Sequence, residues 1–156
     1  MIAAFAFLVG VSVSAHKKNE TLVISGITVP PEPSSLINNA TLAGVDSNNN
    51  GVRDDVERVL AQQFGGTTDY SFAMAYARTY QDMLIAPTPT QRADALTVYS
   101  KIMCSVRGGS NVVQNFEMTK LVVNTAARKR ARSVFDDVLL GFSPEELSPC
   151  ATSTSP

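Results

Sequence analysis

Histidine, cysteine and tryptophan are scarce in this chain. It has one histidine, two cysteines and no tryptophan among its 156 residues. Ser-His-Asp and Cys-His catalysis both need a histidine inside the fold, and so do histidine-based zinc sites. The single histidine, His16, follows an apolar N-terminal run, where an exposed terminal position is expected. The sequence therefore predicts that the protein is not an enzyme, and no motif supports the remaining alternative of a carboxylate-based glycosidase.

An excess of positive charge is also lacking. Lysine and arginine total 13 and aspartate and glutamate total 14, which gives a net charge of −1. A duplex-binding protein usually shows a clear basic excess, so we expect no nucleic-acid partner. The hydrophobic content of 44% is typical of a globular protein, and the length fits one domain.

No segment is long enough for a comfortable membrane span. Residues 2–14 carry no charge and are mostly apolar, but a transmembrane helix needs about 20 such residues. The small side chains of Val13, Ser14 and Ala15 suit signal peptidase, so residues 1–15 are predicted to be a signal peptide. The mature protein is then exported, periplasmic or extracellular, without a transmembrane span. No lysine or arginine precedes the run, which a signal peptide usually has, and an uncleaved anchor or a buried element stays open as an alternative.

Export would place both cysteines in an oxidising compartment, where Cys104 and Cys150 are predicted to form a disulfide. Closing that loop would stabilise the fold by about 4 kcal/mol in the chain-entropy account. A cytosolic location would instead leave two free thiols.

The predicted architecture is all-α, a small bundle of about four helices with an extended, proline-rich N-terminal arm. The arm and linker cover residues 16–45, and residues 21–29 could form one extended strand because they are rich in β-branched side chains. The helical domain covers residues 46–150, and a disordered tail covers residues 151–156.

Four helical stretches follow from the apolar periodicity. They run from Val52 or Asp54 to the glycine pair at 65–66, over 69–86, between Pro89 and Gly108, and over 110–140 with a break near Asn124. In the last stretch, the side chains expected to face the core are Phe116, Val123, Ala127, Val134 and Val138.

Residues 46–57 have the spacing of a calcium-binding loop. Oxygen-bearing side chains occupy loop positions 1, 3, 5, 9 and 12, and Gly51 occupies position 6. Calcium prefers six to eight oxygen ligands, so the pattern predicts a Ca²⁺ cofactor. The expected ligands are the side chains of Asp46, Asn48, Asn50, Asp54 and Glu57 and the backbone carbonyl of Val52. The residues expected to point away from the ion are Ser47, Asn49, Arg53, Asp55 and Val56.

This loop resembles the EF-hand loop and, more closely, the loops of bacterial thrombospondin type-3-like calcium repeats, where an apolar residue also follows the glycine. The resemblance covers the loop and the helix that leaves it, and it implies calcium binding without enzymatic activity. An EF-hand usually has an apolar residue where this chain has Arg53, and a helix entering the loop, against which Gly44 argues.

The predicted calcium affinity of the loop is low. Three acidic ligands and a single loop favour weak binding, with a dissociation constant on the order of 10⁻⁵ to 10⁻³ M. The alternative interpretation is an asparagine-rich turn that binds no metal and caps the following helix.

A basic run near the C-terminus comprises Arg128, Lys129, Arg130 and Arg132. It is either a solvated helix face, partly paired with Asp136 and Asp137, or a surface for an anionic partner such as lipid headgroups or cell-wall polymer.

The leading functional hypothesis is a small exported calcium-binding protein that acts by binding a protein partner, with calcium in a mainly structural role. The alternative is a periplasmic inhibitor or immunity-type protein directed against a secreted toxin or hydrolase.

Overall fold

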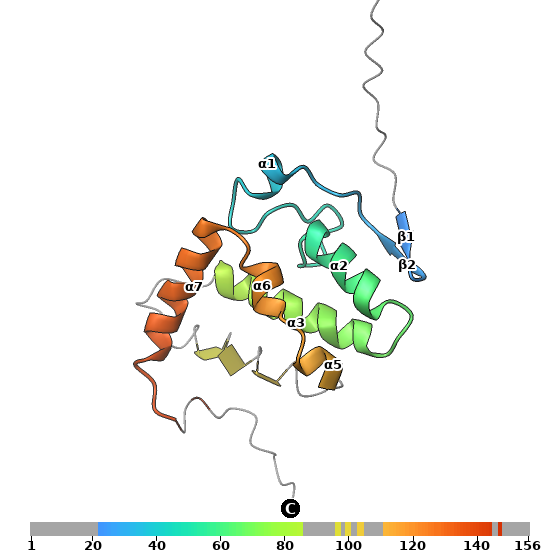
Figure 1. The fold of residues 1–156 in the computed structure, drawn as a ribbon. Coiled ribbons are helices and arrows are strands. Elements are labelled where there is room, and N and C mark those ends of the chain that lie inside the picture. The colour runs from blue at the N-terminus through green and yellow to red at the C-terminus, as the bar shows by residue number, and fades with distance from the viewer. Residues whose placement is uncertain are drawn as a thin grey trace, which may run out of the picture.

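Helices dominate the structure, a computed structural model that describes residues 22–85, 96–97, 99–100, 103–104, 111–144 and 147. The described residues contain six helices and one two-stranded sheet (Figure 1). The prediction of a mostly helical protein is therefore confirmed, whereas a purely α-helical bundle of four helices was wrong. The predicted signal peptide and the tail at 151–156 lie outside the described residues. None of the described helices is both long and apolar enough to cross a membrane.

Two helices, α2 (Asp54–Phe64) and α3 (Asp69–Leu84), pack against each other at the centre of the fold. Val52, Val56, Leu60 and Phe64 recur at helical spacing and are all buried against α3. Both helices were predicted with nearly these bounds, because their apolar spacing is regular and a pair of glycines separates them.

The β-branched segment near the N-terminus forms a hairpin rather than one strand. Strand β1 (Leu22–Ile24) pairs antiparallel with β2 (Ile27–Val29). The turn residues Ser25 and Gly26 have φ angles of 48° and 80°. Two successive positive φ angles match the twist of the flanking strands, so the segment folds back and pairs with itself.

The proline-rich arm is held on α2 by Arg58. Its Nη1 donates to the carbonyl of Pro30 at 2.8 Å, and its Nε pairs with Glu32 at 2.6 Å. The arm continues into the short helix α1 (Ser35–Asn38), which the Ser34 side chain caps by accepting a hydrogen bond from the backbone N–H of Ile37. The arm therefore lies beside the helical body.

Three helices make up the C-terminal part: α5 (Asn111–Gln114), α6 (Met118–Val122) and α7 (Ala126–Leu139). All three contact α3, and Figure 1 shows α7 near the C-terminal end of α3. The predicted break near Asn124 is confirmed, and a second break at 115–117 was not predicted. Of the helix expected between Pro89 and Gly108, the structure describes only residues 96–97, 99–100 and 103–104, which are helical.

The buried face of α7 is displaced by one residue from the prediction. Arg128, Phe135 and Val138 are buried, whereas Ala127 and Val134 are exposed. The predicted inward positions of these last two residues were therefore wrong. An arginine occupies a core-facing position, so counting only apolar residues gives the wrong phase for the first turns.

The described part of the chain holds no free cysteine, and Cys104 is disulfide-bonded. Cys150 lies outside the described residues, so the pairing of Cys104 with Cys150 stays a prediction.

Candidate metal centre

The loop at 46–57 leads directly into α2. Residues 39–53 contain no helix, so no regular helix enters the loop. The backbone N–H of Asp54, at loop position 9, donates to the carbonyl of Val45, the residue before the loop, at 2.9 Å. Gly51 has a φ of +81°, the left-handed conformation that a sharp turn at position 6 requires. Local sequence therefore sets the course of this loop.

Three of the predicted ligand side chains meet at Glu57. Its Oε2 accepts hydrogen bonds from Nδ2 of Asn48 at 3.0 Å and from Nδ2 of Asn50 at 2.9 Å. Glu57 is only 4% exposed. Burial first, and then the charge of Glu57, raise the pKa of Tyr70. Loop positions 3, 5 and 12 are thus brought together around a buried carboxylate.

The other two acidic side chains hold the loop backbone. Asp46 accepts from the backbone N–H groups of Asn50 at 3.1 Å and Gly51 at 2.8 Å. Asp54, which is 1% exposed, accepts from the N–H of Ser47 at 3.0 Å. Among the residues that the structure describes, no three His, Cys, Asp or Glu side chains form a group that could hold a metal.

Half of the predicted ligands are amide or backbone oxygens, which do not belong to the His, Cys, Asp and Glu side chains named above. Such oxygens are ligands that a hard cation such as Ca²⁺ accepts, so the donor set fits a hard cation. Rotating the Asn48 and Asn50 amides about their last side-chain bonds would turn their oxygens toward Glu57, with loss of the hydrogen bonds that these oxygens accept from the backbone N–H groups of Asn50 at 3.3 Å and Val52 at 2.8 Å. Glu57 would then face two oxygens instead of two N–H donors.

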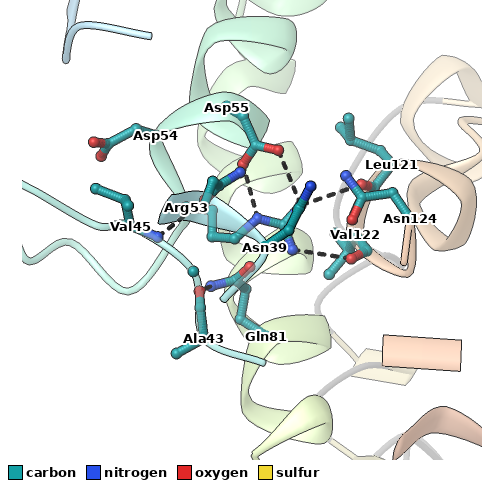
Figure 2. A network of polar contacts seen from close by, with 12 residues as sticks. Asn39, Ala43, Val45, Arg53, Asp54, Asp55, Gln81, Leu121, Val122 and Asn124 are labelled. Carbon is teal, nitrogen blue, oxygen red and sulfur yellow. Dashed lines mark hydrogen bonds and ion pairs between the residues drawn. The ribbon is translucent and has the colours of Figure 1, made fainter. Parts of the chain in front are cut away.

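Arg53, at loop position 8, points away from these ligands and toward α6. It is fully buried, and its Nη1 donates to the carbonyl of Val122 at 3.0 Å. Its Nε and Nη2 pair with Asp55 at 2.8 and 3.2 Å. Figure 2 shows Asp54 and Asp55, neighbours in sequence, projecting to opposite sides of the chain. The loop is therefore fixed to the C-terminal helices by its own arginine.

The basic run is not a continuous charged surface. Arg128 is fully buried and bonds to five oxygens from two segments, namely the carbonyls of Asn38, Thr41 and Leu42 and the side chains of Asn39 and Asn124. Arg132 contacts both carboxylate oxygens of Asp136 at 2.7 and 2.8 Å. Arg128, Lys129, Arg130 and Arg132 were predicted as a surface for an anionic partner. That prediction is wrong for Arg128, because its guanidinium is buried and hydrogen-bonded within the fold.

Arg53, Arg128, Asp55, Asn38 and Gly44 form one group, here called the arginine cluster. The Asn38 side chain accepts from the N–H of Val45 at 3.0 Å. A Cβ on Gly44 would lie 2.2 Å from Cδ of Arg53 and 2.9 Å from Nη2 of Arg128. The segment before the loop thus passes between two buried guanidinium groups, where only glycine fits.

The cluster is also coupled electrostatically. Burial raises the pKa of Asp55, but its hydrogen bond to Arg53 and the charge of Arg53 outweigh burial, with help from Asn38, and hold it below the ordinary 3.8. Burial and the charge of Arg53 lower the pKa of Arg128, and Asp55 opposes them. Asp55 was expected to face outward. Instead, it is half-buried and balances two buried cations.

We expect Asp55→Asn to lower the free energy of unfolding by about 1–3 kcal/mol, the usual loss for a hydrogen bond to a charged partner. The side chain is 18% exposed and contacts a fully buried guanidinium. Asp137→Asn, the same chemical change at an exposed site on α7, should stay within about 0.5 kcal/mol of wild type in urea titrations at pH 7. Equal losses in the two variants would contradict this role for Asp55.

The same pair predicts a pH dependence. Because the folded pKa of Asp55 is lowered, its stabilising effect is present above the ordinary value of 3.8 and is lost as the pH falls through the lowered folded value. The stability difference between wild type and Asp55→Asn should therefore shrink when urea titrations are moved from pH 7 to below that value. A difference that stays constant would contradict the assignment.

Sequence reasoning singled out residues 46–57, whose calcium binding stays a prediction, and missed the arginine cluster. One signal was present: Arg53 occupies the position where an EF-hand usually has an apolar residue, and it is buried here as that residue would be. Arg128 gave no such signal, since it lies within a run of basic residues. No protein-family model, curated protein or solved structure matches this chain.

Proposed function

We propose that the loop at 46–57 binds Ca²⁺ and that the protein is a small exported calcium-binding protein acting through a protein partner. The observation that carries the proposal is the convergence of Asn48 and Asn50 on the buried carboxylate of Glu57, at 3.0 and 2.9 Å. These are loop positions 3, 5 and 12 of the pattern that calcium loops use.

Burial of the acidic side chains supports a cation at this place. Asp54 is 1% exposed and Glu57 is 4% exposed. None of the ion pairs found within the described residues involves Asp46, Asp54 or Glu57. Buried carboxylates are usually paired with a cation or coordinate a metal, and Ca²⁺ would supply the positive charge.

Calcium would act on the fold through the arginine cluster. Val52, the expected carbonyl ligand, directly precedes Arg53, whose side chain reaches α6. An ion that fixes the loop therefore also fixes the N-terminus of α2 and the contact with α6, which is a structural role for the metal.

The partner would dock beside the loop. A pocket of about 470 Å³ separates the arm from the loop, and two of its lining residues, Ser47 and Asp54, belong to the loop. Ile37 lines it and is 64% exposed, and the neighbouring Leu36 is 83% exposed. Exposed apolar side chains around a concave site are typical of a binding surface, which calcium would hold in shape.

The test is a melting scan with and without calcium. If Ca²⁺ binds only the folded state, a concentration of 100 times the dissociation constant adds about 2.7 kcal/mol to the free energy of unfolding. We expect chelation to lower the melting temperature and calcium to restore it. Magnesium should substitute poorly, because it demands tighter octahedral geometry.

Two variants and one control assign the effect to the loop. Asp46→Ala and Glu57→Gln should lose the calcium response, because each removes a charged ligand. Ser47→Ala should keep it, because Ser47 contributes its backbone N–H rather than its hydroxyl to the loop. Identical wild-type melts in chelator and in millimolar calcium would leave the loop as an asparagine-rich helix cap.

A further inference from the structure

A second pocket lies between α6 and α7, away from the calcium loop. It has a volume of about 460 Å³ and is lined by Thr119, Lys120, Val123, Asn124, Lys129 and Arg132. Figure 1 shows the short connection between α6 and α7 from which two of these residues come. The volume is in the range of small-molecule sites, and half of the lining residues are cationic.

The two lysines supply the net charge of this pocket. Arg132 is neutralised by Asp136, whose two oxygens both contact its Nε. Lys120 pairs with Glu117, but the two side chains are 76% and 65% exposed, so water weakens that attraction. Lys129 is exposed on α7. The pocket therefore offers two positive charges to a ligand.

Asn124 adds an oriented donor. Its Oδ1 accepts from Nη1 of Arg128 at 2.7 Å, and Arg128 is itself fully buried. With the oxygen engaged, the amide nitrogen is the polar atom of Asn124 that can donate to a ligand. A side chain fixed in this way loses little conformational entropy when it binds.

We propose that this pocket binds the phosphate group of a small phosphomonoester. A phosphomonoester carries close to two negative charges near pH 7, which match Lys120 and Lys129. Its oxygens accept hydrogen bonds from the lysines and from the Asn124 amide. Val123 lines the pocket beside these donors and can contact an apolar ester group. The proposal is independent of calcium binding.

A flat anionic membrane fits this face less well. The exposed side of α7 presents Asp137 as well as Arg130, and Asp136 is also partly exposed. Acidic groups beside basic ones would repel an anionic lipid surface, whereas a single phosphate is small enough to enter the pocket that both lysines line.

The test is an isothermal calorimetric titration of the full chain with phenyl phosphate. We expect saturable binding that weakens as sodium chloride is raised, because the contacts are ionic. Lys129→Ala should weaken binding about tenfold, the usual loss for one charge-assisted hydrogen bond. Arg130→Ala is the matched control, since it removes the same charge from the next residue of α7, which does not line the pocket. It should change the affinity by less than about twofold.

Inorganic phosphate and phosphatidylglycerol vesicles complete the experiment. If Lys129→Ala weakens the binding of inorganic phosphate as much as it weakens the binding of phenyl phosphate, the phosphate subsite is supported. The ester group then contributes little to the affinity. The proposal is overturned if phenyl phosphate shows no saturable binding at about 10 mM, tenfold above a millimolar dissociation constant. It is also overturned if Lys129→Ala and Arg130→Ala weaken phenyl phosphate binding to the same extent. Binding of the protein to the vesicles alone would overturn it as well, because either result would indicate diffuse surface attraction.

Discussion

Arg128→Met is expected to lower the free energy of unfolding by about 3–5 kcal/mol, the cost of leaving buried polar groups without their charged partner. Five oxygens accept from this guanidinium, at distances from 2.7 to 3.2 Å. Methionine keeps the unbranched apolar stem but is shorter and offers no donor. The carbonyls of Asn38, Thr41 and Leu42 would then lose this donor at the place where the segment before the loop meets α7. Urea titration of the purified full chain measures the loss.

Two further variants separate the hydrogen bonds from the charge and from the helix. Arg128→Lys keeps the positive charge but donates from a single nitrogen, so it should lose most of the same free energy. Arg130→Met makes the same chemical change two residues later at an exposed site, and it should stay within about 0.5 kcal/mol of wild type. A loss below about 1 kcal/mol for Arg128→Met would contradict the role of Arg128.

The parts of the fold that could be predicted are those fixed by local sequence. The apolar repeat of Val52, Val56, Leu60 and Phe64 defines α2, and the glycine pair after it ends the helix. The course of the loop at 46–57 is local in the same sense. Most of its hydrogen bonds join residues two to nine positions apart, such as Asn50 to Asp46 and Asn48 to Glu57, and distant contacts come from Arg53 and from Arg78 of α3, which donates to the Asn50 carbonyl at 2.8 Å.

The arginine cluster could not be predicted because its contacts are distant in sequence. Arg53 bonds to carbonyls 68 and 69 residues away, and Arg128 bonds to oxygens 86 to 90 residues away. Nothing in the pattern around either arginine marks its acceptors, because they are mostly backbone carbonyls, which every residue possesses. Burial of such a group becomes favourable only after the chain has already assembled its acceptors.

The same cause explains the error in α7. Apolar counting assigned Ala127 and Val134 to the core, whereas Arg128 and Phe135 take those positions. A buried arginine looks like a surface residue in any hydrophobic pattern. The helix was therefore predicted correctly in its extent and incorrectly in which side chains face the core at Ala127 and Val134.

Gly44→Ala is expected to cost about 2–5 kcal/mol. The left-handed conformation of residue 44, with a φ of +72°, contributes about 1–2 kcal/mol for any side chain. Overpacking contributes a further 1–3 kcal/mol or so. The new Cβ would lie 2.2 Å from Cδ of Arg53, 2.7 Å from Oδ1 of Asn38 and 2.9 Å from Nη2 of Arg128. Both guanidinium groups are bonded at their ends, so neither side chain can move aside without losing hydrogen bonds.

Comparison with Gly26→Ala separates the packing part of the loss in stability from the backbone part. Gly26 has nearly the same backbone conformation, with a φ of +80°, but no atom lies within 4 Å of where its Cβ would be. Its substitution should therefore cost only the backbone term, about 1–2 kcal/mol. Urea titrations of the two variants side by side give the difference directly. Equal losses would mean that the segment before the loop has room to move away from Arg53 and Arg128. The loop would then not be held to the C-terminal helices through this contact, and calcium binding could not reach them by this route.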